Sequence, residues 1–135
     1  MQTTLSWSGS EVLGLVWATD AERTVRLVMS AAQVKVQSDQ GPALWGYLKP
    51  LEVELKGARM SQDLSCAIGA LASATVETGD GASVSSSTDL TLPWHHPQPL
   101  ALTLWFRNGC EVRIEADSAF CEPADDARFT ESHAC

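Results

Sequence analysis

The chain has 135 residues, a formal net charge of −8 and hydrophobic residues at 44% of its positions. This length fits one domain with its own core, so we expect a single globular domain over residues 1–135 with an acidic tail from about residue 117. The sequence has no cluster of lysine and arginine that would favour nucleic-acid phosphates, and no run of about 18 apolar residues that would span a membrane.

The beginning of the chain, MQTTLSWSGSEVLGL, lacks a basic region, a sustained apolar run and a cleavage site of small residues. These three features mark a signal peptide. Because the sequence lacks them, we expect a cytoplasmic protein. An even number of cysteines also fits disulfides, but in the cytoplasm reduced thiols are the rule, with Cys110 packed in the core. The expected free thiols are Cys66, Cys110, Cys121 and Cys135.

Short runs of alternating apolar and polar residues predict strands at 11–17, 24–29, 33–37, 44–48 and 51–57, with turn residues between them. The last of these is the clearest, because Leu51, Val53 and Leu55 alternate with charged residues. Such a strand has one buried face and one wet face, as antiparallel sheets have. Pro50 lies at its start, where a missing N–H costs least.

The stretch 66–78 is ambiguous, because its alanines also allow a helix over 64–74. Gly69 and the β-branched residues near its end favour a strand. Alternation then predicts one shared face for Ile68, Ala70, Ala72, Ala74 and Val76. A short strand at 89–92 ends at Pro93, and three prolines in 93–99 predict an extended segment that cannot join a central ladder.

Residues 100–116 predict a β-hairpin around Asn108-Gly109. A two-residue loop would place Glu111 and Arg113 on the same face as the leucines. A three-residue loop, with Gly109 in the left-handed position, pairs Phe106 with Cys110 and separates apolar from polar side chains. The apolar face is then Leu100, Leu102, Leu104, Phe106, Cys110, Val112, Ile114 and Ala116, and the wet face is Ala101, Thr103, Trp105, Glu111, Arg113 and Glu115.

The acidic end of the chain predicts one further element, a short helix over 123–130 with Pro123 in its first turn. The whole pattern of about nine short strands without βαβ alternation indicates an all-β fold. We expect a mostly antiparallel β-sandwich or barrel.

Motifs for catalysis and cofactor binding are absent from the sequence, and we expect a protein that is not an enzyme and needs no cofactor. His95, His96 and His133 are the candidate metal ligands, but no CxxC, HxxxH or HExxH spacing supports a zinc site. Adjacent histidines in an extended segment point to opposite faces. Glu52 and Glu54 lie on a predicted wet strand face, where carboxylates are usually solvated.

Aromatic residues are the remaining sequence feature that indicates a binding surface, because tryptophan is enriched at binding hot spots. The candidate interaction residues are Trp94 in the proline-rich segment, Trp105 and Arg113 on the wet hairpin face, and Phe129 near the C-terminus. Each also has a structural interpretation, as part of the core, as a covered face or as an anchor for the tail.

The function expected from these observations is a non-enzymatic binding protein, for example an acidic adaptor- or immunity-like module for a basic protein partner. Residues 115–135 carry six acids against Arg128 alone, which fits such a partner. Two other classes stay open. One is a carrier whose barrel interior, lined by Ala70, Ala72 and Ala74, holds an apolar ligand. The other is a structural homo-oligomer such as a homodimer, joined through an edge strand or Trp105.

Overall fold

The computed structural model describes residues 2–18, 23–60, 64–78, 85–87 and 89–132. Within these residues the chain forms twelve strands and no helix. The strands are β1 (Gln2–Trp17), β2 (Val25–Gln37), β3 (Leu44–Lys49), β4 (Leu51–Lys56), β5 (Gly69–Thr78), β6 (Ser85–Ser87), β7 (Asp89–Leu92), β8 (Trp94–His96), β9 (Leu100–Phe106), β10 (Glu111–Ala116), β11 (Ser118–Cys121) and β12 (Arg128–Glu131).

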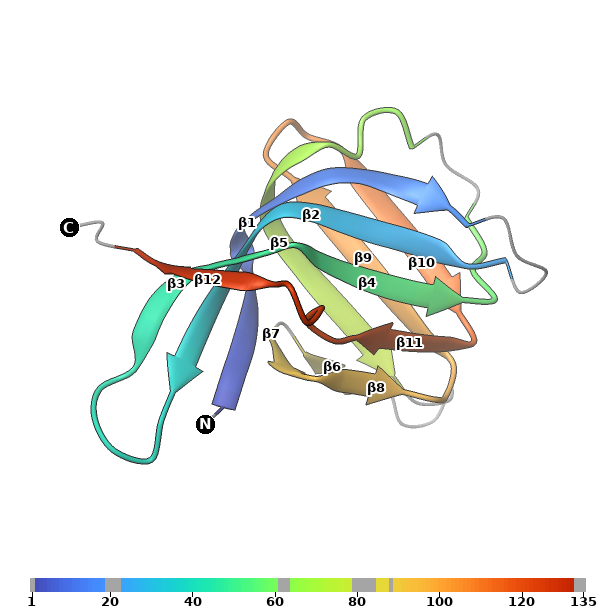
Figure 1. The fold of residues 1–135 in the computed structure, drawn as a ribbon. Coiled ribbons are helices and arrows are strands. Elements are labelled where there is room, and N and C mark those ends of the chain that lie inside the picture. Colours follow the sequence, from blue (N-terminus) through green and yellow to red (C-terminus); the bar gives the residue numbers. More distant parts are fainter. Residues whose placement is uncertain (1, 19–22, 61–63, 79–84, 88, 133–135) are drawn as a thin grey trace.

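All the strand pairs are antiparallel and belong to one sheet, whose main order is β10-β9-β5-β1-β2-β4-β11-β8. The predicted all-β class is therefore confirmed. The sheet curves round on itself in Figure 1 but does not close, so neither a barrel nor a sandwich is confirmed. Among the described residues, no helix has the length and apolar character needed to cross a membrane.

The strands β1 and β2 are longer than the short runs expected, and they tie two halves of the sheet together (Figure 1). The two runs predicted at 24–29 and 33–37 are one strand, β2. Its first part pairs with β4 and its second part pairs with β3. Likewise, β1 pairs with β7 near its start and with β5 at Glu11 and Val12.

The bend in β1 between these halves lies at Gly9 and Ser10, where the register with β2 shifts. Gly9 has a φ of 93°, a conformation that glycine adopts without strain. The Ser10 side chain is buried, and its hydroxyl donates to the Ser6 carbonyl at 2.7 Å and accepts from the Gln33 N–H at 2.9 Å. These bonds satisfy backbone groups that the bend takes out of the regular ladder.

The predicted hairpin is confirmed in β9 and β10. The Phe106 N–H donates to the Cys110 carbonyl at 2.9 Å, and Gly109 has a φ of 92°, as the three-residue loop requires. All eight residues of the predicted apolar face are buried. Ala101 and Thr103 differ from the prediction, since they are buried as well. They are short side chains on a strand between β5 and β10, where Glu77, Arg113 and Glu115 lie beside them.

The structure confirms a strand rather than a helix at β5, but the predicted face is only partly right. A register shift between Leu71 and Ser73 breaks the alternation. Ala74 and Val76 are buried as expected, whereas Ile68, Ala70 and Ala72 are exposed and Leu71 takes the core position instead. The alanine-lined interior proposed for a carrier is therefore wrong at Ala70 and Ala72.

The predicted C-terminal helix is also wrong. The chain makes a turn, in which the Ala127 N–H donates to the Ala124 carbonyl, and continues as strand β12 along the edge of β3. Phe129 pairs with Leu48, and its ring packs over Gly46. Free backbone groups at the edge of β3 and a place for one aromatic ring outweigh the local preference for a helical turn.

The segment predicted from its prolines to be extended forms β8, a strand at the end of the sheet that pairs only with β11 in the described part of the chain. The expectation of four reduced thiols is wrong for two cysteines, because Cys66 and Cys110 form a disulfide. Cys121 is free and buried, and Cys135 lies outside the described residues.

Candidate functional site

The outer face of β2, β4, β11 and β8 carries a row of directly paired side chains. Arg26 lies opposite Glu54, Glu54 lies opposite Phe120, and Phe120 lies opposite His95. The Arg26 Nε lies 3.5 Å from a Glu54 oxygen, and the His95 ring meets the Phe120 ring edge-on at a centroid distance of 4.9 Å. Period-two alternation produces this row, because the residues between these positions point into the core.

Acidic side chains surround Phe120 on this face. Glu54 is its cross-strand neighbour, and Glu122 follows two residues after Phe120. The carboxylate of Glu122 lies 3.4 Å from the His95 Nε2. Glu52 and Glu122 are exposed, while Glu54 and Phe120 are half-buried.

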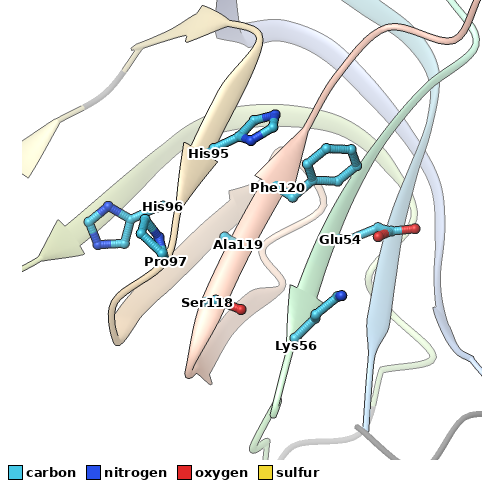
Figure 2. Close-up of a pocket in the computed structure, with 8 residues that line it drawn as sticks. All are labelled: Glu54, Lys56, His95, His96, Pro97, Ser118, Ala119 and Phe120. Atoms are coloured by element: carbon cyan, nitrogen blue, oxygen red, sulfur yellow. The ribbon is translucent and has the colours of Figure 1, made fainter.

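Two hollows flank the Phe120 ring, and both are lined by Phe120 and Glu54. The first, shown in Figure 2, has a volume of about 320 Å³ and extends past His95 toward Lys56 and Ser118. The second has a volume of about 210 Å³ and extends the other way, toward Glu52 and Glu122. We call Glu52, Glu54, Phe120, Glu122 and His95 the acidic face. Its second hollow combines three carboxylates with an aromatic ring.

The two adjacent histidines point in opposite directions, as expected for an extended segment. His95 lies on the acidic face, whereas His96 is half-buried and points away from Phe120 (Figure 2). The His96 ring is nearly parallel to that of Trp94, with centroids 6.3 Å apart. His133 lies outside the described residues. Within the described ranges, no three His, Cys, Asp or Glu side chains gather as a group that could hold a metal ion.

The predicted interaction residues do not meet at one place. Trp94 packs against the core from β8, and Phe129 packs over Gly46 from β12. Trp105 and Arg113 lie on the hairpin at the opposite end of the strand order from β8. The Trp105 Nε1 donates to a carboxylate oxygen of Glu111, its cross-strand partner.

Arg113 belongs to a chain of ion pairs. Its guanidinium lies 3.5 Å from Glu77 and 3.8 Å from Glu115, and Arg59 lies 2.9 Å from Asp117. Arg59 also exchanges backbone hydrogen bonds with Glu115, at 2.7 and 3.1 Å. These contacts connect the segment after β4 to β10. The ion pairs of Arg113 therefore belong to the contacts that hold the fold together.

Sequence reasoning missed Phe120 and Glu122 and regarded Glu52 and Glu54 as solvated. Ser118-Ala119-Phe120-Cys121 does alternate, and this signal would have placed Phe120 and Glu122 on one outer face. No local signal shows that β11 pairs with β4, so the meeting of Phe120 with Glu54 could not be read from the chain.

A second feature is an apolar groove of about 330 Å³ between β1, β2, β3, β12 and the segment before β12. It is lined by Thr3, Val34, Val36, Leu48, Pro123, Ala124, Ala127 and Phe129. All eight residues are uncharged, in contrast to the acidic face. Its uncharged lining fits an uncharged apolar ligand.

Comparisons of the chain with protein-family models, curated proteins and solved structures found no match in any of the three.

Proposed function

We propose that this chain is a non-enzymatic binding module whose acidic face docks a basic segment of a partner protein. The observation that carries the proposal is the convergence of Glu52, Glu54 and Glu122 around one side of Phe120. A lysine or arginine side chain entering the second hollow would meet carboxylates and would place its charge over the face of the Phe120 ring. Charge-assisted hydrogen bonds and cation–π attraction both favour such a guest.

Arginine fits this hollow better than lysine. Its planar guanidinium can bond two carboxylates at once and stack on an aromatic ring, whereas the lysine ammonium is a compact charge. Glu54 is already paired with Arg26, and Glu122 lies beside the His95 imidazole. A guest would therefore meet Glu52 without competition and would compete with His95 for Glu122. The net charge of −8 adds long-range attraction for a basic partner and speeds its association.

The test is a titration with a short arginine-rich model peptide, followed by amide chemical shifts of the labelled protein. We expect the shifts to concentrate on β4 and β11 around Glu52, Phe120 and Glu122. The double variant Glu52→Gln/Glu122→Gln should weaken binding about fivefold or more, equivalent to about 1 kcal/mol.

The matched control is Asp39→Asn/Glu131→Gln, which removes two exposed acids elsewhere and changes the net charge equally. This control should bind the peptide nearly as well as the unaltered chain. Equal weakening of the two double variants would show that only the overall charge attracts the peptide, and the proposed docking face would be abandoned.

The apolar groove beside β12 supports a second candidate function, the carriage of an uncharged apolar molecule. Native mass spectrometry of the purified protein separates the candidates. Extra mass matching a small apolar molecule, lost when Ala127→Trp fills the groove, would favour the carrier. A bare chain would favour the binding module, and a mass of two chains would favour the homodimer.

A further inference from the structure

The disulfide between Cys66 and Cys110 joins two parts of the chain that are 44 residues apart. Cys66 lies in the connection between β4 and β5, just before β5 begins. Cys110 lies at the end of the hairpin turn between β9 and β10. Cys66 is exposed, whereas Cys110 is only 8% exposed. An external thiol therefore reaches this bond from the Cys66 side.

The same hairpin turn also holds the connection by hydrogen bonds. The Asn108 Nδ2 donates to the carbonyls of Cys66 at 3.0 Å and Ile68 at 3.3 Å. The Arg107 N–H donates to the Ala70 carbonyl at 2.9 Å. The disulfide is thus one of two attachments between the hairpin turn and the connection. The other attachment consists of these hydrogen bonds, which do not depend on redox state.

The described parts of the connection contribute apolar residues to the core. Ala67 is fully buried, and Leu64 is half-buried against the core cluster. At the other end of the connection, Ala58 is also fully buried, and Arg59 forms its bridge to Glu115. The bridge at Arg59 and the disulfide at Cys66 therefore attach this connection to β10 and to the turn before it.

We propose that the Cys66–Cys110 disulfide is a redox-sensitive latch that holds residues 64–68 against the hairpin turn at Cys110 in oxidising surroundings and loosens them under dithiol reductants. Opening begins when a thiolate of the dithiol attacks the Cys66 sulfur, and Cys110 leaves as a thiolate that takes up a proton. The second thiol of the reductant then resolves the mixed disulfide. Two cysteine thiols and one oxidised dithiol result.

The third described cysteine does not interfere with this exchange. Cys121 is fully buried on β11, and desolvation raises the pKa of its thiol to about 12. Because the thiolate is the reactive form, Cys121 does not attack the disulfide in the folded protein. The latch therefore opens and closes between Cys66 and Cys110 without exchange at Cys121.

The latch also bears on where the protein works. A cytoplasmic chain would meet thioredoxin-like dithiols and keep the latch open, whereas an oxidising compartment would keep it closed. After opening, the Asn108 hydrogen bonds and the sheet remain, so the change is confined to residues 64–70 and the adjoining turn.

The test is hydrogen–deuterium exchange of the full chain before and after treatment with dithiothreitol, with mass mapping of the Cys66–Cys110 link. We expect reduction to speed exchange roughly tenfold at 64–70 and 107–110, and to leave β4 and β11 unchanged. The variant Cys66→Ser/Cys110→Ser should exchange like the reduced protein and ignore dithiothreitol. The control Cys121→Ser, with the latch intact, should still respond to the reductant.

Three results would overturn the latch. The first is identical exchange at 64–70 in oxidised and reduced protein. The second is a chain in which both Cys66 and Cys110 remain alkylatable after treatment with oxidised glutathione. The third is a response that spreads over β4 and β11, because the disulfide would then stabilise the whole fold rather than one local segment.

Discussion

The ring of Phe129 occupies the space that a side chain at Gly46 would need. A Cβ atom built on Gly46 would lie 2.7 Å from two carbons of this ring, closer than real Cβ atoms come to other atoms. β12 lies at the edge of β3 and all four of its residues are exposed, so this aromatic contact and the backbone pairing are what keep it in place. Residues 128–131 of the acidic end therefore belong to the sheet.

Replacing Gly46 with alanine should displace β12. The added methyl group meets the Phe129 ring and the backbone of Thr130, and overpacking of this kind costs about 1–3 kcal/mol. Urea unfolding would report the loss of stability, and faster amide exchange at 128–131 would locate it. Gly14→Ala is the control, because a Cβ there has no atom of the described chain within 4 Å. Similar behaviour of the two variants would refute the role of Gly46.

Replacing Ser10 with alanine should destabilise the bend in β1. The change removes the acceptor of the Gln33 N–H and the donor to the Ser6 carbonyl in a buried place. An unsatisfied buried backbone group costs about 1–3 kcal/mol, and thermal or urea unfolding would measure it. Ser38→Ala, in an exposed turn, should change stability little. An unchanged free energy of unfolding in Ser10→Ala would mean that the Gln33 N–H and the Ser6 carbonyl find other hydrogen-bond partners.

The buried thiol of Cys121 should make stability fall in alkali. Desolvation raises its pKa from 9.0 to about 12, so the folded chain keeps this proton when the unfolded chain has lost it. The contribution of this thiol to the free energy of unfolding is fully present below pH 9 and declines as the pH rises toward 12. Between pH 8 and pH 10 the loss is about 1.4 kcal/mol.

This loss can be checked by measuring the free energy of unfolding at pH 8 and pH 10, for the unaltered chain and for Cys121→Ala. The alanine variant is less stable at pH 8 because it leaves a cavity, but its deficit should shrink by about 1.4 kcal/mol at pH 10. A deficit that stays constant would show that the thiol ionises equally in both states.

The aromatic ring of Phe120 should contribute to cation binding beyond its apolar area. Phe120→Leu keeps an apolar side chain between Glu54 and His95 but removes the π face. We expect affinity for an arginine-rich peptide to fall about threefold, because cation–π attraction at exposed sites is about 0.5–1 kcal/mol. Fluorescence anisotropy of a labelled peptide would measure it. Unchanged affinity would assign binding to the carboxylates alone.

The local pattern was enough to predict the β9–β10 hairpin in its register. Asn108 and Gly109 select the turn, and a slip of one residue would turn the apolar side chains to water. The strand at 51–57 and the opposite orientations of His95 and His96 follow from the same period of two. These are properties of short stretches, in which each residue's face is set by its immediate neighbours.

Contacts between distant residues decided the rest. Whether 123–130 becomes a helix or a strand depends on Gly46, about 80 residues earlier, and local preferences of a few tenths of a kcal/mol cannot compete with an open sheet edge. The register shift at Leu71 exposes Ala70 and Ala72 because Leu71 fits against Phe106. Pairing of Cys66 with Cys110, and of Phe120 with Glu54, exists only once the sheet has formed. The sequence by itself determined the all-β class and one hairpin, because alternation and turn chemistry are local, whereas strand order and the candidate binding face required the tertiary structure.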